Sequence, residues 1–461
     1  MKLPTTRDIQ RYSWFAAAAA YIVVMTVSAS FLSWDIWAAL VIAPILLALS
    51  IPILRFGLRK EADSRIAKLV AVALLAKIFG AMARYALTFE LYGRADADAY
   101  HNSGAALARA FWDGNFNQVM EVEVPKLSGT PFINLVTGLF YIGTGPTKLG
   151  GFLIFSWLSF LGLFLFYKAV VIGFPEANHF RYAVLVFFLP SLVYWPSSLG
   201  KEAWICFALG VTTYGVALIL RHQPLGYPVT GLGLLGTALP RPHITALCAA
   251  SLLVAYLLRR KAWSESKLGP VGKVVGIVVL VGVGAFVATS AASFFKLDEV
   301  SQGSVSNVLD YAGQQSGQGG SEFDAARVRS PAEFPGAALA VLFRPYPWEV
   351  PSVQGLLTSI EGMLLLVLFV ASASRLLRVP GLMFRVPYVA YCVSYTAMFI
   401  IAFSSIGNFG IMTRQRTQVM PLLLVLLVIP LEPRREPEPT PTLEQRARDL
   451  ARAPRSGGPR S

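Results

Sequence analysis

Long apolar segments, separated by short polar ones, recur from residue 13 to residue 431. Three of them, Val274–Ala288, Met363–Ala373 and Leu422–Leu431, contain no charged residue. A helix needs about 20 mostly apolar residues to cross the hydrocarbon core of a bilayer. The pattern therefore predicts an all-α polytopic membrane protein with about 12 transmembrane helices.

The same pattern predicts where individual spans lie. Pro335–Val350 is too short and too often interrupted to cross, so we expect it at the outer interface. Thr130–Thr147 is either a span or a re-entrant helix pair. Leu225–Leu258 is interrupted by Pro240 and Pro242, and is either one broken span or two short ones. The other spans that we place individually are Trp14–Leu32, Trp37–Leu54, Leu69–Phe89, Val274–Phe294, Gly355–Ala373, Pro387–Phe403 and Val419–Ile429.

Composition supports a membrane location and changes the meaning of the net charge. Of the 461 residues, 55% are hydrophobic and 14% are charged, against roughly 45–50% and 25% in soluble domains. Forty Lys and Arg against 26 Asp and Glu give a net charge of +14. The basic residues cluster in short connections, so we predict membrane lipids, and no nucleic acid, as partners.

The cysteines and the N-terminal segment add two expectations. Cys206, Cys248 and Cys392 all lie inside apolar segments, which suggests neither a disulfide framework nor a metal site. Ser13–Ser33 is too long for the apolar region of a cleaved signal peptide. We therefore expect it to remain as the first span.

Clusters of basic residues orient the predicted spans. Residues 55–68 contain five Lys or Arg, and residues 259–273 contain another such cluster. We expect both loops and both termini in the cytoplasm, in a plasma-membrane protein whose active site faces outward. The predicted parts are 1–89 with three spans, 90–130 as an outer acidic loop with an interfacial helix, 131–295 as a central membrane core, 296–354 as an outer loop and interfacial segment, 355–431 with three further spans, and 432–461 as a disordered cytoplasmic tail.

Two carboxylates open the first outer loop, in the run Asp96-Ala-Asp98-Ala-Tyr-His. If the backbone is extended, Asp96 and Asp98 converge on one spot, where they can act as a base or hold a divalent cation, Mg²⁺ or Mn²⁺. Tyr100 and Leu107 follow at helical spacing, which predicts an amphipathic interfacial helix with Asp98 as its N-cap and Gly114 at its end. The alternative interpretation of the pair is an N-cap beside a solvated loop charge.

Three further motifs follow the acidic loop. They are Gly129-Thr-Pro-Phe, a break at Gly143–Gly145, and Phe187-Phe-Leu-Pro-Ser-Leu-Val-Tyr-Trp-Pro-Ser-Ser-Leu-Gly-Lys-Glu. Together with the Asp-Ala-Asp-Ala-Tyr-His run, within residues 67–260, they resemble the GT-C superfamily of membrane glycosyltransferases, including its protein mannosyltransferase and aminoarabinose transferase branches. One feature departs from that family. Two spans precede the span that enters the acidic loop, where the common core has one.

The resemblance implies transfer of a sugar from a polyprenyl-phosphate donor to an extracytoplasmic glycan, lipid or protein acceptor, in the biosynthesis of cell-envelope polysaccharide. Such a reaction needs a base for the acceptor hydroxyl and positive charge for the released phosphate. An inverting transfer can use one carboxylate, and we prefer Asp96 because capping can occupy Asp98.

For the donor phosphate, Arg344 is our first choice, because Pro345 and Pro347 hold its segment out of a helix. Each arginine near the outer face also suits snorkelling or contact with lipid headgroups. The full set of phosphate candidates is Arg344, Arg241, His243, Arg414, Arg416 and Arg84.

Other polar and aromatic residues are candidates for substrate binding. Lys201 and Glu202 either contact substrate or neutralise each other, and Glu361 either pairs with an arginine or binds an acceptor hydroxyl. Aromatic residues such as Trp348 either stack on sugar rings or belong to the aromatic belt of the interface. The full set is Tyr100, His101, Lys201, Glu202, Trp348, Glu349 and Glu361.

Two other functions fit parts of the pattern. A polysaccharide polymerase or ligase acting on polyprenyl-diphosphate glycans would also use outer arginines, and Arg414-Gln-Arg416 suits a diphosphate. A lipid-linked-sugar flippase or transporter would show internal repeats and charges near the bilayer midplane. We find no convincing repeat, and the charges concentrate toward one face, which favours an enzyme.

Overall fold

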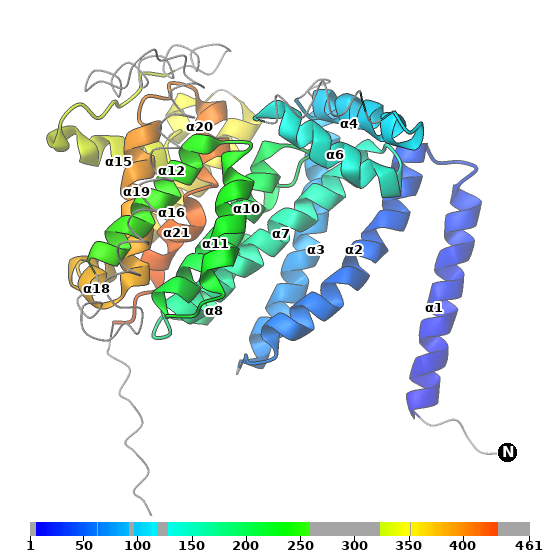
Figure 1. Ribbon diagram of the computed structural model, residues 1–461, viewed down its shortest axis with the longest axis horizontal. Coiled ribbons are helices and arrows are strands. Elements are labelled where there is room, and N and C mark those ends of the chain that lie inside the picture. Colours follow the sequence, from blue (N-terminus) through cyan, green and yellow to red (C-terminus); the bar gives the residue numbers. More distant parts are fainter. Residues whose placement is uncertain are drawn as a thin grey trace, which may run out of the picture.

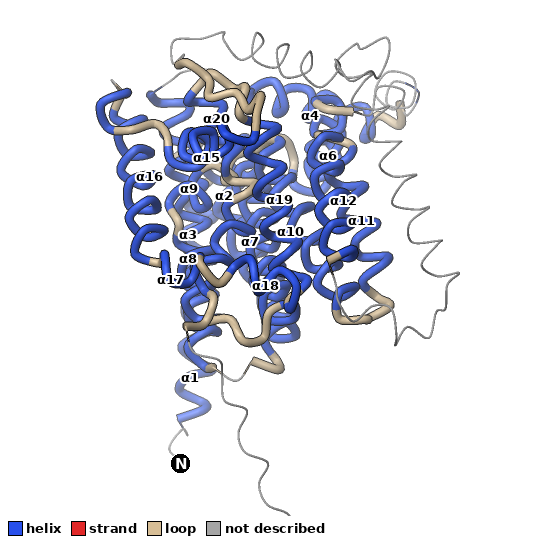
Figure 2. The backbone as a smooth tube through the Cα atoms, turned by 90° about the vertical axis from the view of Figure 1, so that its left-hand side faces the viewer, coloured by secondary structure: helices blue, strands red, loops and turns tan. Residues whose placement is uncertain are grey.

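The computed structural model describes residues 6–61, 63–91, 96–115, 117, 128–258, 323–350 and 352–431. This part of the chain is 80% helical and contains no β-strands, in agreement with the predicted all-α class. Figures 1 and 2 show the helices side by side in a bundle, with α1 (Thr6–Ser28) at its edge. The predicted span Val274–Phe294, most of the predicted loop 296–334 and the predicted tail 432–461 lie outside the described residues.

Long helices alternate with short ones along the chain. After α1 come α2 (Trp34–Leu58), α3 (Ser64–Ala86) with its π-helical continuation η1 (Leu87–Leu91), α4 (Asp96–Trp112), α6 (Thr130–Thr144), α7 (Lys148–Gly173), α8 (His179–Phe188), α9 (Pro190–Tyr194), α10 (Lys201–Leu220), α11 (Gly226–Ala238), α12 (Pro242–Leu257), η4 (Pro331–Glu333), α15 (Phe334–Phe343), η5 (Pro347–Glu349), α16 (Val353–Ala371), α17 (Ala373–Leu376), α18 (Val379–Arg385), α19 (Pro387–Phe403), α20 (Phe409–Arg416), α21 (Met420–Leu423) and η6 (Leu424–Val428).

Five helices of the described part are long and apolar enough to cross a membrane: α2, α3 with η1, α7, α10 and α16. The segment 373–385 and α19, which meet at 116°, would make a sixth span if the bent pair counts as one. The chain is therefore a helical, membrane-embedded protein. The prediction of about 12 spans is not confirmed.

Several predicted spans agree with helices, and one has a different form from the helix that was predicted. Trp37–Leu54 falls inside α2, and Pro387–Phe403 is α19. The predicted span Val419–Ile429 is instead a four-residue α-helix followed by a five-residue 3-10 helix. Its apolar residues are buried against the rest of the bundle. The segment runs from α20 at one end of the bundle to Val428, whose carbonyl accepts from the backbone N–H of Asn178 at the other end. It is apolar because it fills the protein core, so hydropathy does not show that its surface faces protein and not lipid.

The two intervals with open alternatives both contain short helices. Thr130–Thr147 holds the 15-residue helix α6, which packs along α4 and is shorter than the roughly 20 residues of a span, so the non-crossing alternative fits better. Leu225–Leu258 holds α11 and α12, separated at Leu239–Arg241 beside the two prolines, which is the alternative of two short helices.

Helix α7 occupies the centre of the bundle. In the apolar 18-residue stretch of α7, 83% of the residues are buried within the protein. The corresponding share in α16 is 22%, which leaves most of its apolar surface for lipid. Glycines bring α10 close to α7: a Cβ atom on Gly210 would overlap the backbone oxygen of Gly162, and one on Gly162 would overlap that of Cys206. Such small residues let helix backbones approach within a membrane, where packing rather than the hydrophobic effect drives association.

The two ends of the bundle carry different groups. Helices α4, α6 and α20 lie at one end in Figure 1, which we call the pocket end, and the turn between α2 and α3 lies at the opposite end with α8 and α18. Basic side chains link the elements of that opposite end: Arg65 lies 4.5 Å from the Phe180 ring, and Arg181 donates to the Ser372 hydroxyl at 3.3 Å. We call it the basic end.

The close approach of α7 and α10 predicts a strong position effect for glycine substitution. Gly210→Ala should lower the unfolding temperature, because overpacking costs about 1–3 kcal/mol, whereas Gly231→Ala, on α11 with no atom within 4 Å of the added Cβ, should not. Thermal unfolding of both variants in the same detergent checks this. Equal stability of the two variants would contradict the described packing.

Candidate functional site

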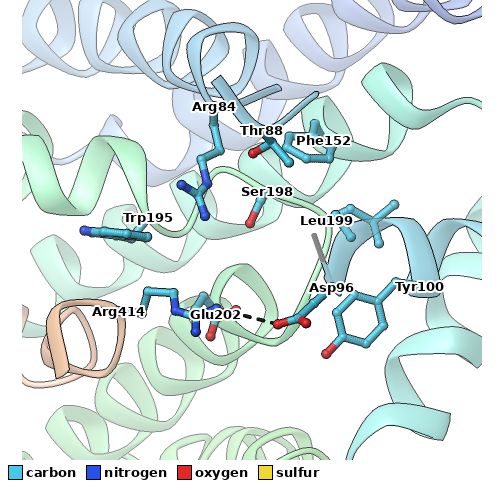
Figure 3. Close-up of a pocket in the computed structure, with 11 residues that line it drawn as sticks. Arg84, Thr88, Asp96, Tyr100, Phe152, Trp195, Ser198, Leu199, Glu202 and Arg414 are labelled. Carbon is cyan, nitrogen blue, oxygen red and sulfur yellow. Dashed lines mark ion pairs between the residues drawn. The ribbon is translucent and has the colours of Figure 1, made fainter. Parts of the chain in front are cut away.

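A pocket opens at the pocket end, where several elements meet (Figure 3). The space between its walls is open to solvent, and its volume is about 390 Å³ when this open part is included. Its lining combines two guanidinium groups, two carboxylates, hydroxyls and aromatic rings from α3, η1, α4, α7, α10, α20 and the segment between α9 and α10. The lining residues are Arg84, Thr88, Asp96, Ala97, Tyr100, Phe152, Trp195, Ser198, Leu199, Glu202 and Arg414.

Asp96 presents an accessible carboxylate to this pocket. It is the first residue of α4, and its side chain is 78% exposed. Its Oδ2 lies 3.6 Å from Nη1 of Arg414 on α20. The negative charge suits the positive end of the α4 dipole, where an acidic residue stabilises the helix. Asp96 therefore offers a negatively charged oxygen that a small molecule can reach.

Arg84 lies on the opposite wall of the pocket. Its Nη1 donates to the Tyr194 hydroxyl at 2.8 Å, and its guanidinium lies 4.7 Å from the ring centroids of both Tyr194 and Trp195. Cation–π contacts of this kind hold the side chain in place. Its Nε is buried and has no hydrogen-bond partner among the described residues. The residue nevertheless lines the pocket and places positive charge at its wall.

The second pocket carboxylate, Glu202, forms an ion pair with Arg241, which does not line the pocket. Its Oε1 accepts from Nη2 of Arg241 at 2.9 Å, and Nη1 of Arg241 donates to Oε1 of Gln415 at 2.7 Å. The side chains of Glu202 and Arg241 are only 16% and 10% exposed. Among the described residues, Lys201 and Glu202 form no direct ion pair. The partner of Glu202 is Arg241, and the pair joins α10 to the start of α12 and to α20.

Tyr100 adds a hydroxyl that stays protonated. Burial, with the nearby charges of Glu202 and Asp96, raises the pKa of Tyr100 to about 12. A phenol with that pKa is a hydrogen-bond donor throughout the physiological pH range. Lys201, the neighbour of Glu202, lies toward Gly129, since a Cβ on that glycine would be 3.9 Å from the Lys201 Nζ.

The structure does not bring Asp96 and Asp98 together. The extended backbone that would align them is replaced by the first turn of α4, where residues i and i+2 point in different directions. Asp98 Oδ1 pairs with Lys148 Nζ at 2.7 Å, which ties α4 to α7. Asp98 is therefore not the N-cap, although α4 does end as predicted, at Gly114 with φ of +70°.

This geometry also bears on the predicted divalent cation. Asp98 is engaged by Lys148, and Asp96 faces Arg414, so the two carboxylates do not form one cation site. Among the described residues, no three His, Cys, Asp or Glu side chains cluster as metal ligands. The requirement for Mg²⁺ or Mn²⁺ stays a prediction.

His101, another predicted substrate-binding residue, lies on the α6 side of α4. Its Nδ1 is 2.8 Å from the Tyr141 hydroxyl, which donates to the Thr147 carbonyl at 2.9 Å. Burial lowers the pKa of His101, so the ring is neutral near pH 7. His101 thus joins α4 to α6 and does not line the pocket.

Arg344, the first choice for phosphate, also lies outside the pocket lining. Its Nε and Nη2 donate to Glu349 Oε1 at 2.9 and 2.5 Å. The guanidinium lies 4.4 Å from the Phe323 ring centroid. Trp348, 76% exposed, stacks on Tyr346 at the rim of this cluster. The prolines do keep the segment out of an α-helix, but the Arg344 guanidinium is paired with the carboxylate of Glu349, five residues further on.

Of the remaining candidates, Arg416 and Glu361 are buried and bind backbone groups. Arg416 Nη1 donates to the carbonyls of Leu342 and Arg344 at 2.9 and 2.8 Å. Glu361 Oε2 accepts the backbone N–H of Ser191 at 2.7 Å. His243 is packed with its ring 6.0 Å from that of Phe403. None of the three belongs to the pocket lining.

Some functional positions were not predicted from the sequence. Thr88, Phe152 and Ser198 line the pocket without any earlier signal of their own. Ser198 and Trp195 do lie in the Phe187–Glu202 run that carries the family resemblance, so the motif located the wall without identifying its residues. The π-helical turn η1 places Thr88, and such turns often occur at functional sites.

Comparison of the chain with protein-family models, with curated proteins and with solved structures found no match in any of the three.

The Arg241–Glu202 pair predicts non-additive stability effects. Arg241→Met leaves a buried carboxylate unpaired, which typically costs about 3–5 kcal/mol, and Glu202→Gln leaves the guanidinium unpaired. The double variant should be more stable than the sum of the two losses implies. Thermal unfolding of all four proteins checks this, with Arg65→Met, in an exposed pair at the basic end, as the control that should change little. Additive single effects would contradict the pair.

Proposed function

We propose that the chain is an integral-membrane glycosyltransferase of the GT-C type, which transfers a sugar from a polyprenyl-phosphate donor to an extracytoplasmic glycan, lipid or protein acceptor. The observation that carries this proposal is the juxtaposition of Asp96, Arg414 and Arg84 in one pocket at the end of apolar helices. One accessible carboxylate and two arginines are the groups that such a transfer requires.

The proposed reaction inverts the configuration at the anomeric carbon of the sugar. Asp96 accepts the proton of the acceptor hydroxyl as that oxygen forms a bond to the anomeric carbon. The bond between this carbon and the phosphate oxygen breaks, and its electron pair stays with the phosphate. Arg84 and Arg414 stabilise the negative charge that develops on the phosphate, since guanidinium groups match phosphate oxygens in geometry and charge. Tyr100, protonated at neutral pH, donates a hydrogen bond to the sugar or its phosphate.

The distribution of charge supports an extracytoplasmic pocket. Arg65, Arg181, Arg221 and Arg375 lie at the basic end, and the positive-inside rule assigns such an end to the cytoplasm. At the pocket end, by contrast, arginines such as Arg241 are paired with carboxylates. The proposal keeps a plasma-membrane location and more spans than the five described.

The two alternatives receive less support from this geometry. A diphosphate site built from Arg414-Gln-Arg416 requires both arginines at one ligand, but Arg416 is buried on the carbonyls of Leu342 and Arg344. A transporter is expected to hold its charges near the bilayer midplane. The accessible charges here gather in a pocket at one end of the bundle.

The experiment that tests the function is a transfer assay. Purified protein is incubated with a panel of radiolabelled polyprenyl-phosphate sugars and with membrane extract as the source of acceptor. We expect label to move from one of the donors to an acceptor. Absence of transfer across the panel, together with translocation of a lipid-linked sugar in liposomes, would contradict the proposal and favour a transporter.

The assignment of Asp96 predicts a clear difference between the two carboxylates of α4. Asp96→Asn should lower turnover by about 10²–10⁴-fold at normal protein abundance, because a general base is lost. Asp98→Asn should mainly loosen the contact with Lys148 and keep turnover within a few-fold of the native protein. Initial rates and unfolding temperatures of both variants check this. Equal loss of turnover in the two would contradict the separate roles.

The proposed phosphate site predicts a second difference, between two arginines. Arg414→Lys keeps the charge but loses the planar fork, so it should raise the KM for the donor. Arg344→Lys should leave this constant unchanged, because Arg344 pairs with Glu349 outside the pocket. Donor titrations of the two variants decide between them. A raised KM in Arg344→Lys alone would return the phosphate site to our original first choice.

A further inference from the structure

One wall of the pocket is a break in helical structure. Helix α9 ends at Tyr194, and a non-helical segment, residues 195–200, leads into α10. Trp195, Ser198 and Leu199 of this segment line the pocket. Carbonyl groups near the end of α9 have no helical partner further along the chain, so they need donors from elsewhere.

Lys77, in the middle of α3, supplies those donors. Its side chain is buried, with 1% of the residue exposed. Its Nζ lies 2.8 Å from the carbonyl oxygen of Leu192, 3.2 Å from that of Pro196 and 2.9 Å from Oγ of Ser197. The Ser197 hydroxyl donates its own hydrogen to the Val193 carbonyl, so it accepts from Lys77. Three acceptors require three N–H groups, which only the ammonium form provides.

The same face of α3 continues from Lys77 to the pocket. Gly80 lies one turn further on, and a Cβ there would come within 2.7 Å of the Val193 carbonyl oxygen, so α9 packs directly against the helix. Arg84 lies a further turn on, and it holds the rings of Tyr194 and Trp195. Residues at i, i+3 and i+7 share one face of a helix. Lys77 thus anchors the segment that shapes the surroundings of Arg84.

We propose that Lys77 is a positioning residue, whose ammonium group holds residues 192–197 against α3 and so keeps Arg84, Trp195 and Ser198 in place for the donor phosphate. The part about the donor rests on the proposed function, whereas the part about the wall does not. Lys77 does not line the pocket, so it acts through the wall. Without it, the carbonyls of Leu192 and Pro196 are left in an apolar interior without their donor, the Ser197 hydroxyl keeps only Ser156 as a donor at 3.0 Å, and α9 opens more often.

The wall is tested by hydrogen–deuterium exchange of the full chain in nanodiscs, followed by mass spectrometry. In Lys77→Met, amides in residues 190–200 should exchange about tenfold faster, because hydrogen bonds to a charged group are lost. Ser197→Ala removes one of the three acceptors and should give a smaller increase in the same residues. It also remains informative if Lys77→Met fails to fold.

Ser50→Ala is the matched control. Ser50 is as buried as Ser197, bonds the carbonyl four residues earlier in the same way, and accepts from one side chain, the indole of Trp157 at 2.8 Å. It lies outside the pocket wall, so exchange in residues 190–200 should stay at the native rate. The proposal is overturned if Ser50→Ala raises that exchange as much as Ser197→Ala, or if neither Lys77→Met nor Ser197→Ala raises it.

The effect on the donor is tested by steady-state kinetics with the polyprenyl-phosphate sugar that serves as substrate. Ser197→Ala should raise the KM for the donor several-fold while kcat changes little, because Asp96 on α4 is untouched. An unchanged KM in an active protein whose wall has loosened would overturn the donor role of Lys77. If the native protein turns over no donor, the proposed function fails, and the exchange experiment still decides whether Lys77 positions the wall.

Discussion

Backbone that leaves the helical form inside an apolar bundle must find hydrogen-bond partners in the protein, because the surrounding lipid offers none. The segment from Leu189 to Gly200 finds these partners in two side chains of neighbouring helices. At its start, the backbone N–H of Ser191 donates to Glu361 on α16. Further along, the carbonyls of Leu192 and Pro196 accept from Lys77 on α3. Without these two buried side chains, polar backbone groups of the wall that carries Trp195 and Ser198 would lack partners, and the wall would open more often.

The charges around the pocket divide into two kinds. Some form ion pairs within the protein: Arg241 with Glu202, Asp98 with Lys148, and Arg344 with Glu349. The first two pairs join helices that are distant in the sequence, and they prepare the site without taking part in the proposed chemistry. Asp96 and Arg84 differ, since Asp96 is exposed and Arg84 lines the pocket without a carboxylate partner among the described residues. A site with this division is rigid in its frame and open at its reactive groups.

The sequence was informative where one residue pattern has one structural meaning. Apolar length predicted α2, α16 and α19 closely, and proline positions predicted the gap between α11 and α12. It failed where a partner distant in the chain decides the outcome. Prolines suggested that Arg344 is free for a ligand, but Glu349 and Phe323 engage it. Hydropathy cannot separate a lipid-facing span from a core-filling segment such as Val419–Ile429. The sequence also could not place Asp96, because its partner Arg414 lies more than 300 residues away in the sequence.

We propose that the pocket, one wall of which is the segment from Pro190 to Gly200, binds a lipid phosphate between Arg84 and Arg414. Electron cryomicroscopy of the protein in nanodiscs, with a bound antibody fragment and added polyprenyl phosphate, tests it directly. The account predicts density for a phosphate in contact with both guanidinium groups, with the wall from Pro190 to Gly200 in the form described. Phosphate density at Arg344, or a pocket that stays empty at saturating lipid, would contradict it.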